Sequence, residues 1–318
     1  MTVGLSGRAP EAEREAVRAA ARAGGREADL RLFTGRADFL AALPDMEVLA
    51  GGGLRSGDLA LATRLRWLQV GSAGVERLPL AEIAAAGVFL TNARGLHADA
   101  MADHALASLL ALSRHVPAFV QAQQERRWAP RTGDVLAGRR LGILGFGEIG
   151  RAIAQRASAF GMEIWATRRR PAPDRAVARM LGGSRAELLE LCAACDDLIA
   201  VLPSTPATRG QLDAEAFARM KPGARFVNLG RGDLLDEAAL EAALRSGRLA
   251  GAACDCLPRE PLPADASLWT APGLLITPHV GGSRPDAGER AAAFFCANLT
   301  RYCRGETLHN LVDLHAGY

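Results

Sequence analysis

The chain has 318 residues, of which 49% are hydrophobic, and its 38 basic and 35 acidic residues give a net charge of +3. This length predicts two domains with sizeable cores. The near-balanced charge argues against a nucleic-acid partner, and the absence of a signal-peptide pattern and of any apolar run of about 18 residues predicts a cytoplasmic protein that does not bind a membrane.

The cysteine pattern indicates neither a metal site nor a disulfide framework. Six cysteines are scattered along the chain without paired zinc-site spacing, so we expect no metal. Cys192 and Cys195 form a C-x-x-C near the end of an expected helix, where two half-buried small residues are more plausible than a redox pair.

Residues 1–95 alternate short apolar runs with helical segments rich in Ala and Arg. This alternation predicts a parallel sheet with helices on both faces. A small-residue loop, Gly71 to Gly74, follows the fourth strand and is either an ordinary turn or a set of N–H groups for a carboxylate. The expected strands are Thr2–Leu5, Leu30–Phe33, Val48–Ala50, Leu65–Val70 and Val88–Thr91, with a helix at Pro10–Ala23.

The segment His97–Gln124 has the longest helical pattern in the chain. Pro117 is expected to kink or break it. Its length predicts a helix that bridges two domains or packs at a subunit interface. A final helix, Pro285–Tyr302, is expected to cross back to the first domain.

A Gly-x-Gly-x-x-Gly turn lies between an apolar run and a helical pattern. In such a turn Gly145 makes the tight bend, Gly147 lets backbone N–H groups approach a pyrophosphate, and Gly150 lets the helix pack on the strand. The phosphates then lie at the helix N-terminus, where the dipole favours anions. With a second strand at Met162–Ala166, the motif predicts a dinucleotide-binding βαβ unit.

The rest of this region predicts four more strands, which makes six in a doubly wound α/β domain. Ser184 with Glu187 is expected to form a capping box, and Asp213 and Asp236 to cap helices. The six expected strands are Arg139–Leu144, Met162–Ala166, Asp197–Leu202, Arg225–Leu229, Leu249–Cys254 and Leu274–Ile276.

Three of these strands end in residues with acid–base or anion-binding chemistry. Arg231 stands between two glycines after one strand, Glu260 follows Asp255 after the next, and His279 follows the last. In a parallel sheet the carboxyl ends of the strands share one edge, which is where ligands bind. An Arg can grip a carboxylate, and a His beside a Glu can transfer a proton near neutrality.

The residues after the strand Met162–Ala166 indicate which nicotinamide cofactor is preferred. NAD-binding folds of this type place an acid there for the ribose 2′-hydroxyl. Here Thr167 is followed by Arg168 and Arg169, and no acid occurs between Glu163 and Asp174. A guanidinium pairs with a 2′-phosphate, so we expect NADP(H) to be preferred over NAD(H); a solvated basic turn is the alternative.

Together these blocks resemble the signatures of the D-isomer-specific 2-hydroxyacid dehydrogenases. The likeness includes Val227–Gly232, Asp255–Pro263 and Pro278–Gly282, and Leu262–Trp269 is most similar to the glyoxylate/hydroxypyruvate reductase branch. The resemblance implies two doubly wound parallel-sheet domains. A Rossmann domain at 96–284 would be inserted in a flavodoxin-like substrate domain, 1–95 with 285–318, and the protein would be a homodimer.

The resemblance also implies roles for individual residues. His279 would be the general acid/base, Glu260 would orient it, and Arg231 would bind the substrate. The substrate, a small 2-oxo or 2-hydroxy acid, would contact Ser72, Ala73, Gly74, Arg231 and His279. The residues implied at the cofactor are Gly145, Phe146, Gly147, Glu148, Ile149, Gly150, Thr167, Arg168, Arg169, Leu202, Pro203, Thr208, Leu229, Gly230, Asp255, His279 and Gly281.

Two other functions remain open on the same fold. One is a dinucleotide-sensing binding protein that resembles the corepressors of this fold. The other is a dehydrogenase of a different acid, although formate oxidation goes with Gln where this chain has Glu260. The pocket for the substrate's third carbon depends on Leu54, Gly95, Leu96 and Trp128, which do not by themselves identify the acid.

Overall fold

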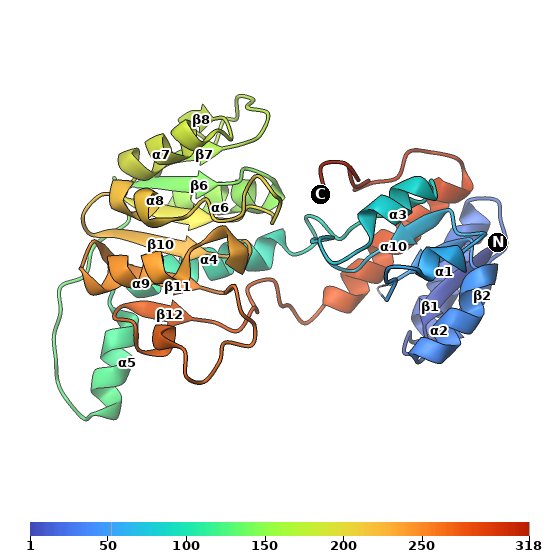
Figure 1. Ribbon diagram of the computed structural model, residues 1–318, viewed down its shortest axis with the longest axis horizontal. Helices are drawn as coiled ribbons and strands as arrows, with labels where there is room; N and C mark the ends of the chain where they lie inside the picture. Colours follow the sequence, from blue (N-terminus) through green and yellow to red (C-terminus); the bar gives the residue numbers. More distant parts are fainter. Residues whose placement is uncertain (52, 318) are drawn as a thin grey trace. The chain divides into compact units, whose positions relative to one another are not determined.

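The computed structural model describes residues 1–51 and 53–317, which form two compact units (Figure 1). His97–Ser283 make up one unit, and the described residues before and after this segment make up the other. The sequence places these boundaries at 95/96 and 284/285, each one residue away from those of the structure. The roles of the two units as substrate and nucleotide domains stay predictions.

The first unit contains a five-stranded parallel sheet in the order β2-β1-β3-β4-β5. Helices α1 and α10 pack against one another in this unit, although they are far apart in the sequence. Its elements are β1 Thr2–Ser6, α1 Glu11–Ala23, β2 Asp29–Phe33, α2 Arg36–Ala42, β3 Val48–Ala50, β4 Trp67–Gln69, α3 Leu80–Ala85, β5 Phe89–Thr91 and α10 Ala287–Cys303.

The second unit contains a seven-stranded parallel sheet in the order β12-β11-β10-β9-β6-β7-β8 (Figure 1). Two parallel α/β sheets confirm the predicted fold class. Its elements are α4 Ala98–Ser113, α5 Val116–Gln124, β6 Arg140–Leu144, α6 Glu148–Ala159, β7 Glu163–Thr167, β8 Arg179–Leu181, α7 Arg185–Ala194, β9 Asp197–Ala200, α8 Ala214–Arg219, β10 Ala224–Asn228, α9 Glu237–Arg245, β11 Leu249–Cys254 and β12 Leu274–Ile276.

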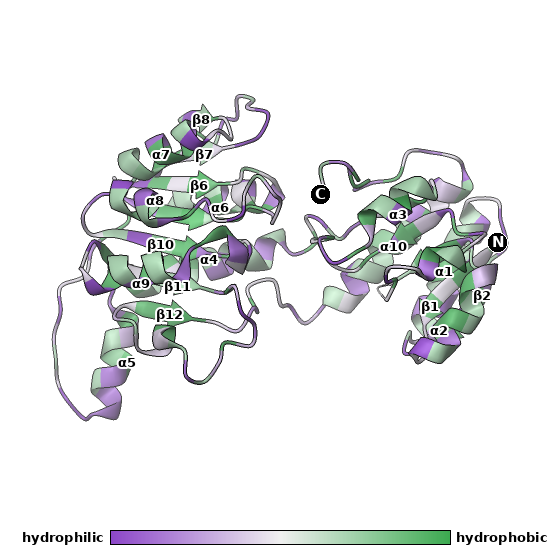
Figure 2. Ribbon diagram, viewed as in Figure 1, coloured by the Kyte–Doolittle hydropathy of each residue, from purple (hydrophilic) through white to green (hydrophobic). Residues whose placement is uncertain are grey.

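The central strands β6, β9 and β10 of the larger sheet are buried along almost their whole length, as a sheet covered by helices requires. Leu141, Ile143 and Leu144 of β6 are at most 1% exposed, and β6 and β12 are green in Figure 2, which marks hydrophobic residues. On α6, Ile153 and Ala157 pack into the same core. Among the described helices, none has the length and apolar character needed to cross a membrane.

The predicted helix caps are confirmed. The Ser184 hydroxyl accepts a hydrogen bond from the Glu187 N–H, and the Glu187 carboxylate accepts one from the Ser184 N–H. Asp213 accepts from the N–H of Ala216 at the start of α8. Asp236 accepts from two N–H groups at the start of α9.

The helical segment His97–Gln124 is broken next to Pro117, as predicted, and forms two helices. Helix α4 ends at Ser113, and His115 then has a φ of 57°, a left-handed conformation that an α-helix cannot contain. Pro117 lies in the first turn of α5, where its missing N–H needs no partner. Helices α4 and α5 belong to the second unit and α10 to the first, and the predicted bridging of the two domains stays a prediction.

Strand β8, at the edge of the larger sheet, is not among the six strands that the sequence predicts. It is three residues long, and only Leu181 is buried. Arg179 instead stacks on the Trp165 ring, with 4.8 Å between the guanidinium carbon and the ring centroid. So short and half-polar a strand has no periodicity that a sequence pattern can detect.

A buried ion network lies at the amino ends of the central strands. The Asp197 carboxylate, fully buried at the start of β9, accepts hydrogen bonds from Arg139 Nε at 2.8 Å and from Arg225 Nη1 at 3.1 Å. Arg225 is 3% exposed and also contacts Asp134. This network joins β9 to its neighbours at the edge opposite the candidate site.

Candidate active site

The larger sheet brings three predicted residues to one edge. Strands β10, β11 and β12 are consecutive neighbours, and their carboxyl ends lead into the segments that carry Arg231, Glu260 and His279. Residues as far as 48 positions apart therefore follow three consecutive strands of the sheet. This arrangement results from parallel pairing, which places all carboxyl ends on the same side.

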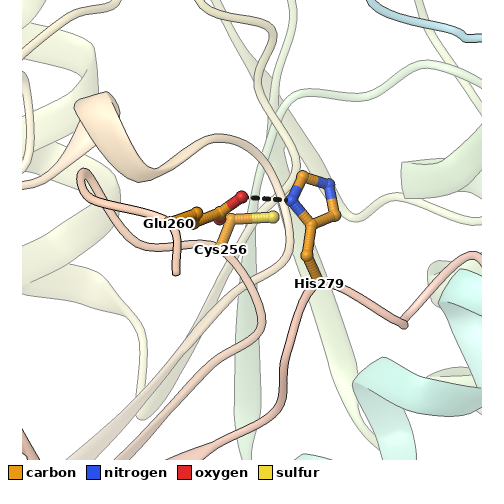
Figure 3. A group of neighbouring side chains, drawn as sticks. All are labelled: Cys256, Glu260 and His279. Carbon is orange, nitrogen blue, oxygen red and sulfur yellow. Dashed lines mark hydrogen bonds and ion pairs between the residues drawn. The ribbon is translucent and has the colours of Figure 1, made fainter. Parts of the chain in front are cut away.

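His279 and Glu260 form a hydrogen-bonded pair (Figure 3). The distance between His279 Nδ1 and Glu260 Oε2 is 2.7 Å, and the other Glu260 oxygen accepts the Leu257 N–H at 3.0 Å. The His279 side chain is 49% exposed, and Nε2 has no hydrogen-bond partner among the described residues. A carboxylate on Nδ1 and an available Nε2 are the geometry of a general acid or base.

The backbone around His279 is held in an unusual conformation. Its φ is 55°, which is uncommon for a residue with a side chain. The Asp255 carbonyl accepts the His279 N–H at 2.9 Å. The buried Asp255 carboxylate accepts the N–H groups of Val280 at 2.9 Å and of Gly281 at 2.8 Å. These bonds keep the imidazole aimed from a fixed loop.

The same carboxylate continues a hydrogen-bond chain into α4. The Thr277 hydroxyl lies 2.6 Å from Asp255 Oδ1 and 3.0 Å from His104 Nε2. A hydroxyl has one proton and a carboxylate only accepts, so Thr277 donates to Asp255 and must accept from His104. His104 is therefore protonated on Nε2. His104 and Thr277 are not among the predicted site residues, because a helix histidine is more often structural than catalytic and no local pattern relates residues that are 173 positions apart.

The Asp255 carboxylate is thus fully engaged inside the chain. It accepts hydrogen bonds from Thr277, Val280 and Gly281, and His104 Nε2 lies 3.8 Å from Asp255 Oδ1. Its predicted contact with the nicotinamide remains a prediction, and the structure adds a separate role in holding the His279 loop.

The turn that carries Arg231 is packed against the segment after β11. A Cβ placed on Gly232 would lie 1.9 Å from the Leu257 carbonyl carbon, so only glycine fits there. The Asn228 side-chain amide, fully buried, donates to the carbonyls of Arg231 at 3.1 Å and Cys256 at 3.0 Å. Asn228 is a second positioning residue that is not among the predicted site residues, although it lies within the family-like segment Val227–Gly232.

Cys256 is buried beside the pair, and Figure 3 shows its sulfur near the His279 ring. Burial raises the pKa of the Cys256 thiol to about 12. Burial likewise raises the pKa values of Cys192 and Cys195 to about 12, and both thiols are free. Neutral, buried thiols are poor nucleophiles, which supports the structural interpretation of the C-x-x-C.

The glycine turn has the form that a dinucleotide requires. Gly145 has a φ of 101°, and a Cβ on Gly150 would lie 2.4 Å from the Gly145 carbonyl oxygen. A Cβ on Gly147 would have no atom within 4 Å, so the backbone there is open to an approaching group. Glu148 begins α6 directly after it. These residues fit a pyrophosphate on the helix N-terminus.

Leu202 and Gly230, two other predicted cofactor residues, lie close to this turn. A Cβ on Gly145 would lie 3.2 Å from Leu202, whose carbonyl oxygen would lie 2.7 Å from a Cβ on Gly230. The Thr208 hydroxyl donates to the Pro203 carbonyl at 2.6 Å, which fixes the loop after β9. The structure therefore brings together the three loops that follow β6, β9 and β10.

The end of β7 supports a basic cofactor contact. The buried Thr167 hydroxyl accepts the Gly145 N–H at 3.3 Å. Arg168 follows it on the surface, and among the described residues no side chain bonds to its guanidinium. Asp174, the nearest acid in sequence on the C-terminal side, is ion-paired with Arg151 of α6. Asp174 therefore has a cationic partner other than Arg168.

The loop predicted to hold a carboxylate lies in the first unit. The Ser72 hydroxyl donates to the Gly74 carbonyl at 2.7 Å, and the Asn92 amide donates to the Ala73 carbonyl at 2.7 Å. Within the described residues, the N–H groups of Ser72, Ala73 and Gly74 bond to no backbone carbonyl or side chain. The loop is exposed, so these donors can meet a ligand.

Comparison with known proteins decides the family. Residues 106–281 match the family model described as "D-isomer specific 2-hydroxyacid dehydrogenase, NAD binding domain". The chain belongs to this family. A glyoxylate reductase from Pyrococcus furiosus is 35% identical over 79% of this chain and 77% of that protein. A D-3-phosphoglycerate dehydrogenase from Mycobacterium bovis is 33% identical over 92% of this chain.

Coverage of the relatives differs. The chain spans 56% of the mycobacterial protein, so it matches about half the length of the first relatives. A solved D-isomer specific 2-hydroxyacid dehydrogenase from Xanthobacter autotrophicus Py2, in complex with NADPH and MES, has a TM-score of 0.85 and 30% identity. The alignment covers 100% of this chain and 99% of that one.

Proposed function

We propose that this protein reduces a small 2-oxo acid to the D-2-hydroxy acid and prefers NADPH as the cofactor. The observation that carries the proposal is the hydrogen-bonded pair of His279 and Glu260. These residues follow β12 and β11, the two strands beside β10, which leads into the turn with Arg231. Family membership supports the proposal that the cofactor binds at the dinucleotide turn. A bound reduced nicotinamide supplies a hydride to the substrate's carbonyl carbon.

The protein's own residues supply binding and the proton. The Arg231 guanidinium binds the substrate's carboxylate and polarises its carbonyl. His279 gives the proton on Nε2 to the carbonyl oxygen as the carbon receives the hydride, and Glu260 stabilises the imidazolium before that transfer. The N–H groups of Ser72, Ala73 and Gly74 are further donors for the carboxylate, as the family resemblance implies.

A panel of 2-oxo acids tests the substrate class. Relatives of two kinds, glyoxylate reductase and D-3-phosphoglycerate dehydrogenase, are similarly identical to the chain. We expect turnover of glyoxylate and hydroxypyruvate to exceed that of phosphohydroxypyruvate by kcat/KM. A preference for the phosphorylated acid would replace the glyoxylate-type assignment while keeping the reaction.

Arg168 is the residue proposed to select NADPH. Changing Arg168 to Asp removes a partner for the 2′-phosphate and adds a repelling charge. Because a hydrogen bond to a charged group is worth about 1.5–3 kcal/mol, the ratio of kcat/KM with NADPH to that with NADH should fall by about tenfold or more. The matched control is Arg219→Asp, on the exposed end of α8. A parent that favours NADH, or an unchanged ratio in the Arg168 variant, would contradict this role.

Thr277 is proposed to position His279 through Asp255. Changing Thr277 to Val keeps the shape but removes the hydroxyl that links His104 to Asp255. We expect kcat to fall by about tenfold, since loss of roughly 1.4 kcal/mol loosens the loop. Thr277→Ser should restore kcat, and KM should change little in either variant. Equal losses in the Val and Ser variants would show that the hydroxyl is not what matters.

We also propose a homodimer that forms through the second unit. Exposed apolar side chains gather on α5 and on the segment after it: Val116, Phe119, Val120, Trp128 and Val135. Trp128 is 97% exposed, which favours a partner surface. Light scattering at micromolar concentration should give twice the mass of one chain, and Val120→Asp should shift it toward one chain. A wild-type mass of one chain would refute the dimer.

A further inference from the structure

Three metal-binding atoms of different kinds gather at the carboxyl ends of β11 and β12. The Cys256 sulfur, a Glu260 carboxylate oxygen and a His279 ring nitrogen all lie within 4.8 Å of one another. Figure 3 shows the sulfur and the carboxylate on the same side of the imidazole. The sequence spacing does not reveal this group, because the ligands come from two segments that are 19 to 23 positions apart.

The segments that carry these atoms are fixed before any ligand binds. Asn228 holds the Cys256 carbonyl at 3.0 Å, and Asp255 holds the N–H groups after His279. Glu260 is held by the Leu257 N–H at 3.0 Å. A group of donors whose backbone is already ordered loses little entropy on coordinating an ion.

The donor set selects the class of ion. A thiolate, an imidazole and a carboxylate suit Zn²⁺ and similar thiophilic ions, whereas Mg²⁺ and Ca²⁺ prefer oxygen ligands only. Three protein ligands leave a fourth position for water. His279 and Glu260 are 49% and 33% exposed, so an ion from solution reaches them directly.

We propose that Cys256, Glu260 and His279 form a binding site for a thiophilic divalent cation, Zn²⁺ or Cd²⁺, and that the bound cation inhibits the enzyme. The cation replaces the proton between His279 and Glu260, and that proton and the thiol proton go to solvent. With Nδ1 on the metal, His279 loses the carboxylate partner that supports proton transfer. Only the inhibition rests on the proposed function; the binding does not.

Cadmium titration of the metal-free, reduced protein tests the site without substrate or cofactor. The ultraviolet charge-transfer band of a cadmium–thiolate bond should rise to one equivalent per chain. Cys256→Ser and His279→Ala should each weaken binding by about tenfold or more. Cys296→Ser, which removes a half-buried thiol of α10 in the other unit, is the matched control and should leave the titration unchanged. A wild-type protein without the band, or an unchanged band in Cys256→Ser, would overturn the proposal.

Inhibition assays test the proposal that the bound cation blocks the reaction. Zn²⁺ should inhibit wild-type 2-oxo acid reduction reversibly, with recovery on adding EDTA, and Mg²⁺ should not inhibit. The half-inhibiting Zn²⁺ concentration should rise by about tenfold or more in Cys256→Ser. Equal inhibition of both proteins would place the inhibitory ion elsewhere. A protein that binds cadmium but reduces no oxo acid would refute the proposed function and leave the cation site standing.

Discussion

Changing His279 to Ala should lower kcat by about 10²-fold or more, the usual scale of general acid–base catalysis. The variant loses the proton donor for the carbonyl oxygen but keeps Arg231 and the dinucleotide turn. The dissociation constant for NADPH should therefore stay within a few fold of the wild-type value. Steady-state kinetics with hydroxypyruvate and a fluorescence titration of NADPH measure the two quantities.

The control for this substitution is His315→Ala, which removes an exposed histidine of the first unit. It should change neither kcat nor cofactor binding. If His279→Ala retained near-normal kcat across the pH range, His279 would not be the acid, and the pair with Glu260 would be structural.

The second large effect concerns stability. Asp197→Ala should lower the free energy of unfolding by about 3–5 kcal/mol, because the buried Arg225 loses one of its two carboxylate partners. Arg225 is 3% exposed and would keep only Asp134. Arg139 would lose the carboxylate that it binds at 2.8 Å. Urea unfolding of the two proteins measures the difference.

Asp236→Ala is the matched control for Asp197→Ala. It removes an exposed helix cap at the start of α9 and should cost about 0.5–2 kcal/mol. If the Asp197 variant were no less stable than this one, the network at the amino ends of the strands would contribute little to folding.

Much of the fold is predictable because its signals are local. The strand Val48–Ala50 and the strand Leu249–Cys254 are predicted with the bounds that the structure has, since each is a short apolar run between turn residues. The glycine turn at Gly145–Gly150 is also predictable, because it lies between a strand and a helix. Parallel pairing then places Arg231, Glu260 and His279 at one edge without further information.

The features that escape prediction depend on contacts between distant segments. Pro117 predicts a break in the segment His97–Gln124, but the left-handed residue that ends α4, His115, has no sequence signal of its own. The link from His104 through Thr277 to Asp255 joins a helix to two strand ends, and each residue alone has an ordinary interpretation. Cys256 likewise acquires its neighbours only when two loops meet.

The central claim is that the protein transfers a hydride to a 2-oxo acid with a proton from its own side chain. The most direct test is to incubate wild-type protein with NADPH and hydroxypyruvate and to determine the amount and chirality of the glycerate formed. We expect one molecule of D-glycerate for each molecule of NADPH consumed. Tight NADPH binding without glycerate would indicate a dinucleotide-sensing binding protein, and L-glycerate would contradict the proposed geometry of reduction.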